Sequence, residues 1–223
     1  NLLHQVKQLL KEDKHPKYII RTDIQHCFES IPHEQLFELI ENNTLLDYKN
    51  KTMLKGLICN EFEHMNLRCL VSQTNTGIPR GCAISSFLAE LYLSKIDKQI
   101  KEEIGEIAYY NRYVDDIIII IHPSQIPTYK KSINDYKCTI EGIFNQKGLT
   151  LSKEKTQLIK SFGNPVYSIE ILGYEFVVKG NNVETQHTKV KNEKMYKRLD
   201  AVFTRFDKLL KCDYKSAKSY LFD

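Results

Sequence analysis

The segment Tyr113-Val114-Asp115-Asp116 lies between Ile107-Ala108-Tyr109-Tyr110-Asn111-Arg112 and five consecutive isoleucines, Ile117 to Ile121. Apolar and β-branched residues on both sides predict two buried strands joined at this point. Two adjacent carboxylates in such surroundings repel each other, and nearby apolar side chains make them costly to ionise. A bound divalent cation would offset that cost. Alternatively, the second Asp is a turn residue, a position where Asp is common. The segment alone leaves both interpretations open.

The composition is that of an ordinary globular protein, and 223 residues are enough for one sizeable core. The net charge of +4 is mildly basic and gives weak support for a polyanionic partner. The basic excess is uneven, because residues 188–211 hold eight Lys or Arg against three Asp or Glu.

The six cysteines form no CxxC pair, so zinc-finger spacing is absent and a disulfide framework is not expected. We predict buried, reduced thiols in a cytoplasmic protein. The longest aliphatic run is five residues, too short to span a membrane. Only 22 residues precede Asp23, and we expect the chain to be a fragment of a longer protein.

Apolar residues at helical spacing predict six helices. They cover residues 2–11, a segment that Pro32 opens, 51–64, a segment from Ile84, 124–146 and 188–211. Short β-branched or alternating segments predict further strands over 18–24, 66–72 and 167–178, the last turning near 180–182. In the last helix we predict a buried apolar stripe of Leu199, Val202, Phe203, Phe206 and Leu210.

Two features other than the paired carboxylates point to chemistry. Asp23 stands near the C-terminal end of the predicted strand 18–24, where the plainer interpretation is a turn or capping residue. The loop 77–86 is bounded by glycine and feeds a helix, so its backbone N–H groups would suit a phosphate or sugar. Gly81 is equally well explained as an ordinary turn glycine.

Five segments follow one another in a single order along the chain. They are Asp23-Ile24-Gln25-His26-Cys27-Phe28, Ile78-Pro79-Arg80-Gly81-Cys82-Ala83-Ile84-Ser85, Tyr113-Val114-Asp115-Asp116, Gly148-Leu149-Thr150-Leu151 with Lys155-Thr156, and Ile171-Leu172-Gly173-Tyr174. In this order and spacing the chain resembles the palm of reverse transcriptases, especially the bacterial group II intron, retron and phage-defence enzymes. One segment alone is a weak pattern. The five together, in this order, span residues 18 to about 178, which is most of the chain.

The resemblance implies an α+β fold: a polymerase palm with a mostly antiparallel sheet backed by helices, partial fingers and the start of a helical thumb. Residues 1–187 would form the palm with residual fingers elements, and 188–223 the start of the thumb or a connection. It also implies RNA-directed DNA synthesis from dNTPs on an RNA template with a DNA primer, and no membrane partner.

The same resemblance implies a metal site. Asp23 and Asp115 would bridge two Mg²⁺ ions, with Mn²⁺ as a substitute, Asp116 would support them, and the carbonyl of Ile24 would be an extra ligand. Mg²⁺ prefers hard oxygen ligands, and two such ions stabilise the attacking and leaving oxygens of nucleotidyl transfer. Lys155 would reach the triphosphate and protonate the leaving pyrophosphate; its plainer alternative is a solvated turn lysine.

By resemblance, Phe28 stacks beneath the incoming sugar and excludes a 2′-hydroxyl, although a core Phe is the alternative. The nucleotide site would also include Arg80, Gly81 and Ser85. Primer and template contacts would come from Leu172, Gly173, Lys189, Lys194, Lys197 and Arg198. Such phosphate contacts carry no sequence preference, and a solvated basic face is the alternative for the helix.

Two positions depart from the family pattern. Arg80 stands where most of these enzymes carry Gln, and Ser86 where intron and retron enzymes usually carry Pro. Arg at the first position occurs among abortive-infection defence enzymes and favours that type. Untemplated or self-primed DNA synthesis in an anti-phage system, and a non-catalytic nucleic-acid-binding palm, therefore stay as alternatives. A fragment lacking its fingers need not be active in isolation.

Overall fold

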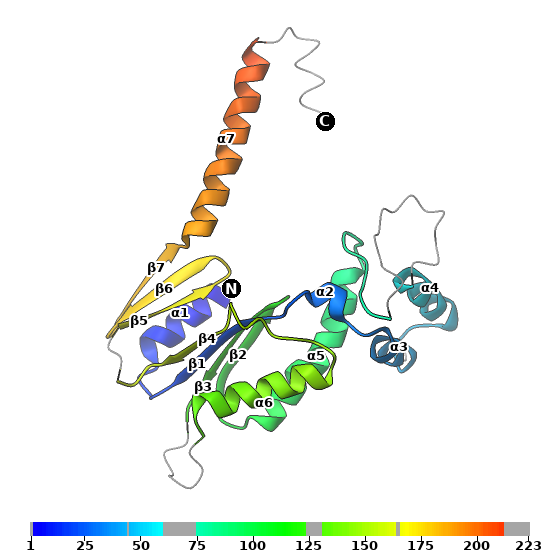
Figure 1. The fold of residues 1–223 in the computed structure, drawn as a ribbon, viewed down its shortest axis with the longest axis horizontal. Coiled ribbons are helices and arrows are strands. Elements are labelled where there is room, and N and C mark those ends of the chain that lie inside the picture. The colour runs from blue at the N-terminus through cyan, green and yellow to red at the C-terminus, as the bar shows by residue number, and fades with distance from the viewer. Residues whose placement is uncertain (1, 44, 60–74, 124–130, 164–165, 212–223) are drawn as a thin grey trace.

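A four-stranded antiparallel sheet forms the centre of the molecule (Figure 1). The computed structural model describes residues 2–43, 45–59, 75–123, 131–163 and 166–211, with the backbone alone described for 206–211. The strand order is β2-β3-β1-β4, where β1 is Tyr18–Asp23, β2 is Ile107–Tyr113, β3 is Asp116–Ile121 and β4 is Gln157–Lys160. β3 lies between β2 and β1, so both of its edges are paired.

The five isoleucines of β3 are buried because both faces of the sheet are covered. Ile117, Ile119 and Ile121 belong to the core beneath two helices, α5 (Ser85–Glu103) and α6 (Ile133–Gln146). Ile118 and Ile120 face the opposite side and pack with residues of α1 (Leu2–Glu12). Alternation along each strand therefore separates two cores, one on each face.

A second antiparallel sheet, of order β5-β6-β7, covers the α1 side of the central sheet (Figure 1). Its strands are β5 (Val166–Ile171), β6 (Tyr174–Lys179) and β7 (Asn182–His187). The core on this side includes Ile169, Ile171 and Phe176. The predicted hairpin turn near 180–182 is confirmed, because β6 and β7 pair on either side of it. Within 167–178 the chain makes a further turn, because Leu172 and Gly173 both adopt positive φ between β5 and β6.

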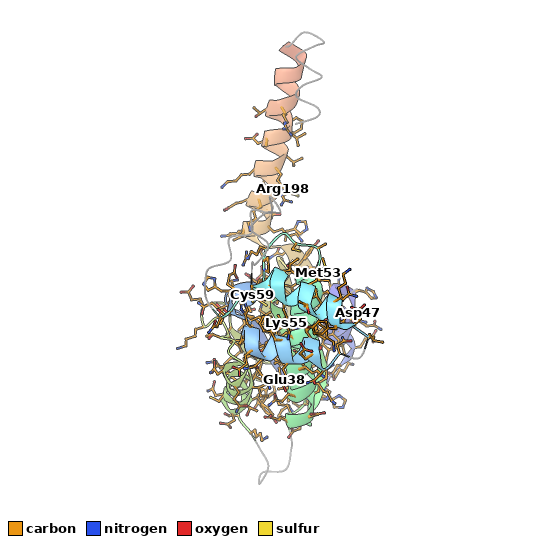
Figure 2. All side chains as sticks on the ribbon, turned by 90° about the vertical axis from the view of Figure 1, so that its right-hand side faces the viewer. Glu38, Asp47, Met53, Lys55, Cys59 and Arg198 are labelled. Atoms are coloured by element: carbon orange, nitrogen blue, oxygen red, sulfur yellow. The ribbon has the colours of Figure 1, made fainter. Side chains whose placement is uncertain are left out.

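The remaining helices are α2 (Cys27–Ser30), α3 (His33–Glu41), α4 (Tyr48–Ile58) and α7 (Lys189–Lys211). α2, α3 and α4 lie beside the first part of α5, and α7 projects from the body of the molecule (Figure 1). Figure 2 shows Arg198 on this projecting helix and Met53 on the outer surface of α4.

The sequence misplaced several apolar side chains. The predicted buried stripe of α7 is wrong for Leu199, Val202 and Phe203, whose exposed fractions are 46%, 62% and 64%. No described element packs on that face, since α7 leaves the body after its first turns. The side chains of Phe206 and Leu210, the other two residues of that stripe, lie outside the described part of the chain.

Other expectations about elements had mixed outcomes. The α+β class, the antiparallel sheet backed by helices, and helices near 2–11, 84–103 and 188–211 are confirmed. β2 is an edge strand with mostly half-exposed residues, so it is not the buried strand predicted. α6 begins at Ile133, where Ser132 and Asp135 form a capping box. The predicted strand 66–72 lies outside the described residues.

No disulfide joins the four described cysteines to one another, and Cys27 is buried whereas Cys59 and Cys138 are exposed. The expectation of reduced thiols agrees with this, but the expectation that they are buried is wrong for the latter two. Among the helices in the described part of the chain, none combines the length and apolar character needed to cross a membrane.

Candidate active site

Three carboxylates gather where β1 ends and the β2–β3 hairpin turns. Asp23 is the last residue of β1 and pairs directly with Asp116, the first residue of β3. Residues directly opposite each other in an antiparallel pair share a face, so both side chains lie on the α1 side. Asp115 precedes β3 in the turn, and its carbonyl accepts a hydrogen bond from the Ile24 N–H at 2.9 Å. This bond ties the hairpin turn to the end of β1.

The hairpin turn itself is unusual because Val114 has a φ of +57°. A β-branched residue rarely adopts this left-handed conformation, which stores strain. Arg112, with a 3% exposed side chain, supports the turn by donating to the Val114 carbonyl at 3.1 Å. Its guanidinium is fixed by Asp97 at 2.7 Å and by Glu90 at 3.0 Å, both on α5. The strained turn is therefore anchored to the helix behind it.

Asp115 experiences the repulsion expected of clustered carboxylates. Burial, followed by the negative charge of Asp23, raises the pKa of Asp115 above the ordinary value of 3.8. The positive charge of Lys155 opposes this shift, and Asp116 adds to it. A cation between Asp23 and Asp115 would relieve the cost, so this donor set fits a hard divalent ion such as Mg²⁺.

Asp116 is held differently. Its Oδ1 accepts from Nε of Arg21 at 3.0 Å, and its Oδ2 accepts from the backbone N–H of Leu172 at 3.0 Å. The side chains of Arg21 and Asp116 are 14% and 10% exposed, so this is a largely buried ion pair. Asp116 thus joins the central sheet to the turn between β5 and β6.

Lys155 lies beside the first carboxylate, with its Nζ 2.9 Å from Oδ1 of Asp23. Its side chain is 56% exposed, so the ammonium can also reach a ligand in solvent. Its backbone carbonyl accepts from Nη1 of Arg21 at 2.9 Å. Arg21 therefore orients both the Lys155 segment and Asp116.

A loop runs alongside α2 and forms a second part of the site. The backbone of this loop is hydrogen-bonded to residues 28–31. The Ile78 N–H donates to the Phe28 carbonyl and the Gly77 N–H donates to the Ile31 carbonyl, both at 2.8 Å. Phe28 is half-buried, and the Arg80 guanidinium stands 6.0 Å from its ring centroid. Arg80 also pairs with Glu29 at 2.5 Å, which lowers the pKa of the Glu29 carboxyl against the opposing effect of burial.

A comparison with models of protein families shows the family of this chain. The family model described as "Reverse transcriptase (RNA-dependent DNA polymerase)" matches residues 1–176. This chain belongs to the reverse transcriptase family. The earlier resemblance of its five motifs to a reverse transcriptase palm is thereby confirmed.

The individual relatives have low sequence identity to this reverse transcriptase. The "Putative COX1/OXI3 intron 2 protein" of Saccharomyces cerevisiae is 28% identical over 90 residues, which are 39% of this chain and 10% of that protein. Apo telomerase from Candida tropicalis, truncated from its C-terminal domain, matches with a TM-score of 0.53 and 17% identity, covering 83% of this chain and 39% of the telomerase. Telomerase from the same organism, in complex with a fragment of telomeric RNA, matches with a TM-score of 0.55 and 16% identity. The match covers 82% of this chain and 32% of the telomerase.

These structural matches show a shared polymerase palm fold. The chain spans well under half the length of each of these relatives.

The other predicted residues of this reverse transcriptase palm lie in two places. Gly81 is exposed with a φ of +82°, and a Cβ there would meet nothing within 4 Å. Ser85 is buried at the start of α5, where its hydroxyl donates to the Pro79 carbonyl and so holds the loop. Ser85 therefore supports the loop from below, rather than presenting its hydroxyl on the surface.

Gly173 stands at the base of α7. Its carbonyl accepts from the Thr188 N–H at 3.0 Å, and a Cβ on it would come within 2.9 Å of the Lys191 side chain. Lys189, Lys194, Lys197 and Arg198 follow on α7, all exposed. They are not brought near the carboxylates by any interaction within the described residues, so their role depends on what lies along the projecting helix.

The sequence did not predict the supporting contacts that Arg21, Arg112 and Glu29 make at the site. A signal for Arg21 existed, because a residue two positions before Asp23 in a strand shares its face. Arg112 and Glu29 had no such signal, since their partners come from distant segments.

Proposed function

We propose that this chain is the catalytic palm of an RNA-directed DNA polymerase, which extends a DNA primer on an RNA template using dNTPs. The observation that carries the proposal is the meeting of Asp23 and Asp115, with the pKa of Asp115 raised by burial and by the charge of Asp23. A pair of carboxylates held in this state fits a divalent cation better than any role in folding.

In this proposal Asp23 and Asp115 hold two Mg²⁺ ions, with Mn²⁺ as a substitute, and the carbonyl of Ile24 is an additional ligand. When bound, such ions stabilise the charge on the attacking 3′-oxygen and on the leaving pyrophosphate. Asp116 keeps the site in place through Arg21 and Leu172, and so acts as a supporting carboxylate.

The chain's own groups bind and orient the nucleotide. The Lys155 ammonium, restrained beside Asp23, is placed to attract the triphosphate and to give a proton from Nζ to the leaving group. Phe28 would stack beneath the sugar, with Arg80 and Gly81 beside it. The base of α7, from Gly173 onward, would contact the primer, and the exposed cations Lys189, Lys194, Lys197 and Arg198 would contact phosphates.

We assign residues 1–187 to the palm with residual fingers elements and 188–223 to the start of a thumb. The biological setting has two candidates. The intron-encoded yeast relative favours an intron enzyme, whereas Arg80 favours untemplated or self-primed synthesis in anti-phage defence.

The test is primer extension on RNA with Mg²⁺, comparing the wild-type protein with Asp115→Asn. We expect loss of at least about 100-fold in rate, since the substitution removes a metal ligand. Glu102→Gln is the matched control, because that carboxylate is 64% exposed on α5. Equal rates for all three would leave the non-catalytic palm as the better explanation. Sequencing products made with and without template would separate templated from untemplated synthesis.

A further inference from the structure

A second group of ligating side chains lies at the opposite end of β3 from the carboxylates. Asp13 follows α1, His15 is two residues further, and His122 immediately follows β3. Oδ1 of Asp13 is 2.9 Å from Nδ1 of His15, and Oδ2 is 2.7 Å from Nε2 of His122. Among the described residues, this is the group of three whose ligand atoms all lie within 4.8 Å of one another.

The carboxylate at the centre of this group is already oriented. The Asp13 side chain is 13% exposed, and its Oδ1 accepts from the His15 backbone N–H at 3.0 Å. The buried Lys17 ammonium lies 3.0 Å from Oδ2 and also bonds to the Asp13 carbonyl. Such bonds to a ligating carboxylate are typical of metal sites, where they fix the ligand before the ion arrives.

The two imidazoles are also in place, but they remain accessible. The backbone N–H of His122 donates to the Glu106 carbonyl at 3.1 Å, which fixes the residue after β3. The two rings are 5.1 Å apart, and the side chains of His122 and His15 are 39% and 77% exposed. The cluster therefore opens to solvent on the imidazole side, where water can supply a further ligand.

We propose that Asp13, His15 and His122 form a binding site for a divalent transition metal of the Zn²⁺ class, separate from the carboxylate site. Two neutral imidazoles and one carboxylate, completed by water, are a donor set that suits Zn²⁺. Mg²⁺ is a poor match, because it prefers oxygen ligands alone.

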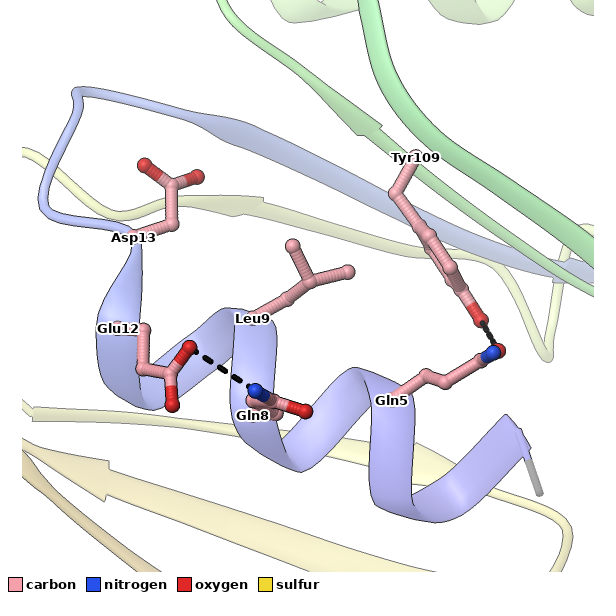
Figure 3. Close-up of a pocket in the computed structure, with 6 residues that line it drawn as sticks. All are labelled: Gln5, Gln8, Leu9, Glu12, Asp13 and Tyr109. Atoms are coloured by element: carbon pink, nitrogen blue, oxygen red, sulfur yellow. Dashed lines mark hydrogen bonds between the residues drawn. The ribbon is translucent and has the colours of Figure 1, made fainter.

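Metal binding here would fasten the N-terminal helix to the central sheet. Figure 3 shows Asp13 at the end of α1, where it lines a groove of about 500 Å³ together with Leu9 and Tyr109. Across this groove, the Tyr109 hydroxyl donates to the Gln5 side chain at 3.2 Å. An ion held by both the α1–β1 loop and the end of β3 would add a second connection, so its expected effect is structural.

Binding is tested by adding Co²⁺, a spectroscopic substitute for Zn²⁺, to metal-stripped protein. We expect one equivalent to bind with the visible d–d absorption of a low-symmetry four-coordinate site. His15→Ala and His122→Ala should abolish this absorption. His15 is exposed, so its replacement leaves the fold intact even if that of His122 does not. His4→Ala, an exposed histidine of α1, and Asp115→Asn should both retain it.

Thermal unfolding gives an independent measure. At 100-fold excess of Zn²⁺ over Kd, the unfolding midpoint of the wild type should rise by roughly 5–10 °C, and that of His15→Ala should not. The proposal is overturned if wild-type protein binds no Co²⁺, or if His15→Ala binds it unchanged. Intense thiolate-to-Co²⁺ charge-transfer bands would also overturn it, because they would place the ion on cysteine rather than on the proposed ligands. None of these outcomes depends on polymerase activity.

Discussion

The two adjacent aspartates of the hairpin should respond in opposite directions to the same substitution. Asp115→Asn removes a charge that burial and Asp23 make unfavourable. Asp116→Asn removes a charge that Arg21 and the Leu172 N–H stabilise. In the metal-free protein we therefore expect the first variant to be more stable than the wild type and the second to be less stable.

The magnitude for Asp116→Asn comes from its partners. The carboxylate offers two acceptor oxygens to two donors, whereas an asparagine offers one oxygen and one NH₂ group. Either Arg21 or the Leu172 N–H must then face another donor and lose its bond. An unsatisfied buried donor costs about 1–3 kcal/mol, and the weakened ion pair adds to this. The total is roughly 2–4 kcal/mol, with little screening because the Arg21 and Asp116 side chains are 14% and 10% exposed.

The gain from Asp115→Asn is smaller, about 0.5–1 kcal/mol, as for other substitutions that remove an unfavourable charge. The raised pKa of Asp115 fixes its pH dependence. A carboxyl that holds its proton more tightly in the folded state lowers stability above its folded pKa, and this cost disappears below the unfolded value of 3.8. The advantage of the variant should therefore be present at pH 7 and vanish as the pH falls toward 4.

Urea unfolding with EDTA at pH 7 and pH 4 measures these differences directly. Mg²⁺ should then stabilise the wild type and Asp116→Asn more than it stabilises Asp115→Asn, because Asp115 is the proposed ligand. Glu102→Gln is again the control. If both aspartate variants lose stability to the same degree, or lose Mg²⁺ stabilisation equally, the assignment of different roles is wrong.

Three further predictions follow from the packing. Gly148→Ala should cost about 2–4 kcal/mol in unfolding free energy, because φ is +70° and the new Cβ would lie 2.6 Å from Cγ of Pro32. The matched change Gly180→Ala, with φ +58° but no atom within 4 Å, should cost only about 1 kcal/mol; equal losses would contradict the steric argument. Arg112→Met should cost about 3–5 kcal/mol in unfolding free energy, because it leaves the Asp97 carboxylate of α5 without its cation. The rate of primer extension should also fall, because the Val114 turn loses its support. Unchanged thermal stability would refute this prediction. Arg80→Gln removes the ion pair on α2, and we expect altered dNTP preference or template dependence in single-nucleotide incorporation assays; identical selectivity would remove the proposed role of this arginine.

Local pattern predicted the strands that flank Asp23 and Asp116, whereas the antiparallel sheet and the grouping of the carboxylates were implied by the resemblance to reverse transcriptases. Five isoleucines in a row can be buried on both faces only in a central strand, and β3 is that strand. The turn at Asp115 and the end of β1 were visible as breaks in that pattern. The sheet pairing then placed Asp23 opposite Asp116, which no local pattern could specify.

Side chains whose environment depends on distant segments were not predictable in this way. The helical stripe of α7 correctly indicated an amphipathic helix, but periodicity does not say whether a covering surface is present nearby. Likewise, β4 is defined by its pairing with β1, more than 130 residues away in the chain. Tertiary pairing, rather than local preference, decides such elements.

Arg21 combines a position that the local sequence pattern specifies with contacts that only the folded structure creates. Its place in β1 follows from strand alternation, but its two partners, Asp116 and the carbonyl of Lys155, come from segments 95 and 134 residues away. A single guanidinium thus fixes the supporting carboxylate and the lysine segment relative to Asp23. Asp116 also accepts from Leu172 in the turn between β5 and β6, and the neighbouring Gly173 carbonyl accepts from Thr188 at the base of α7. A shift of that turn would therefore change the hydrogen bond to Asp116. The site and the base of the projecting helix are therefore connected through hydrogen bonds. In the proposed site, Asp115 would bind the cation, whereas Asp116 holds the surrounding structure.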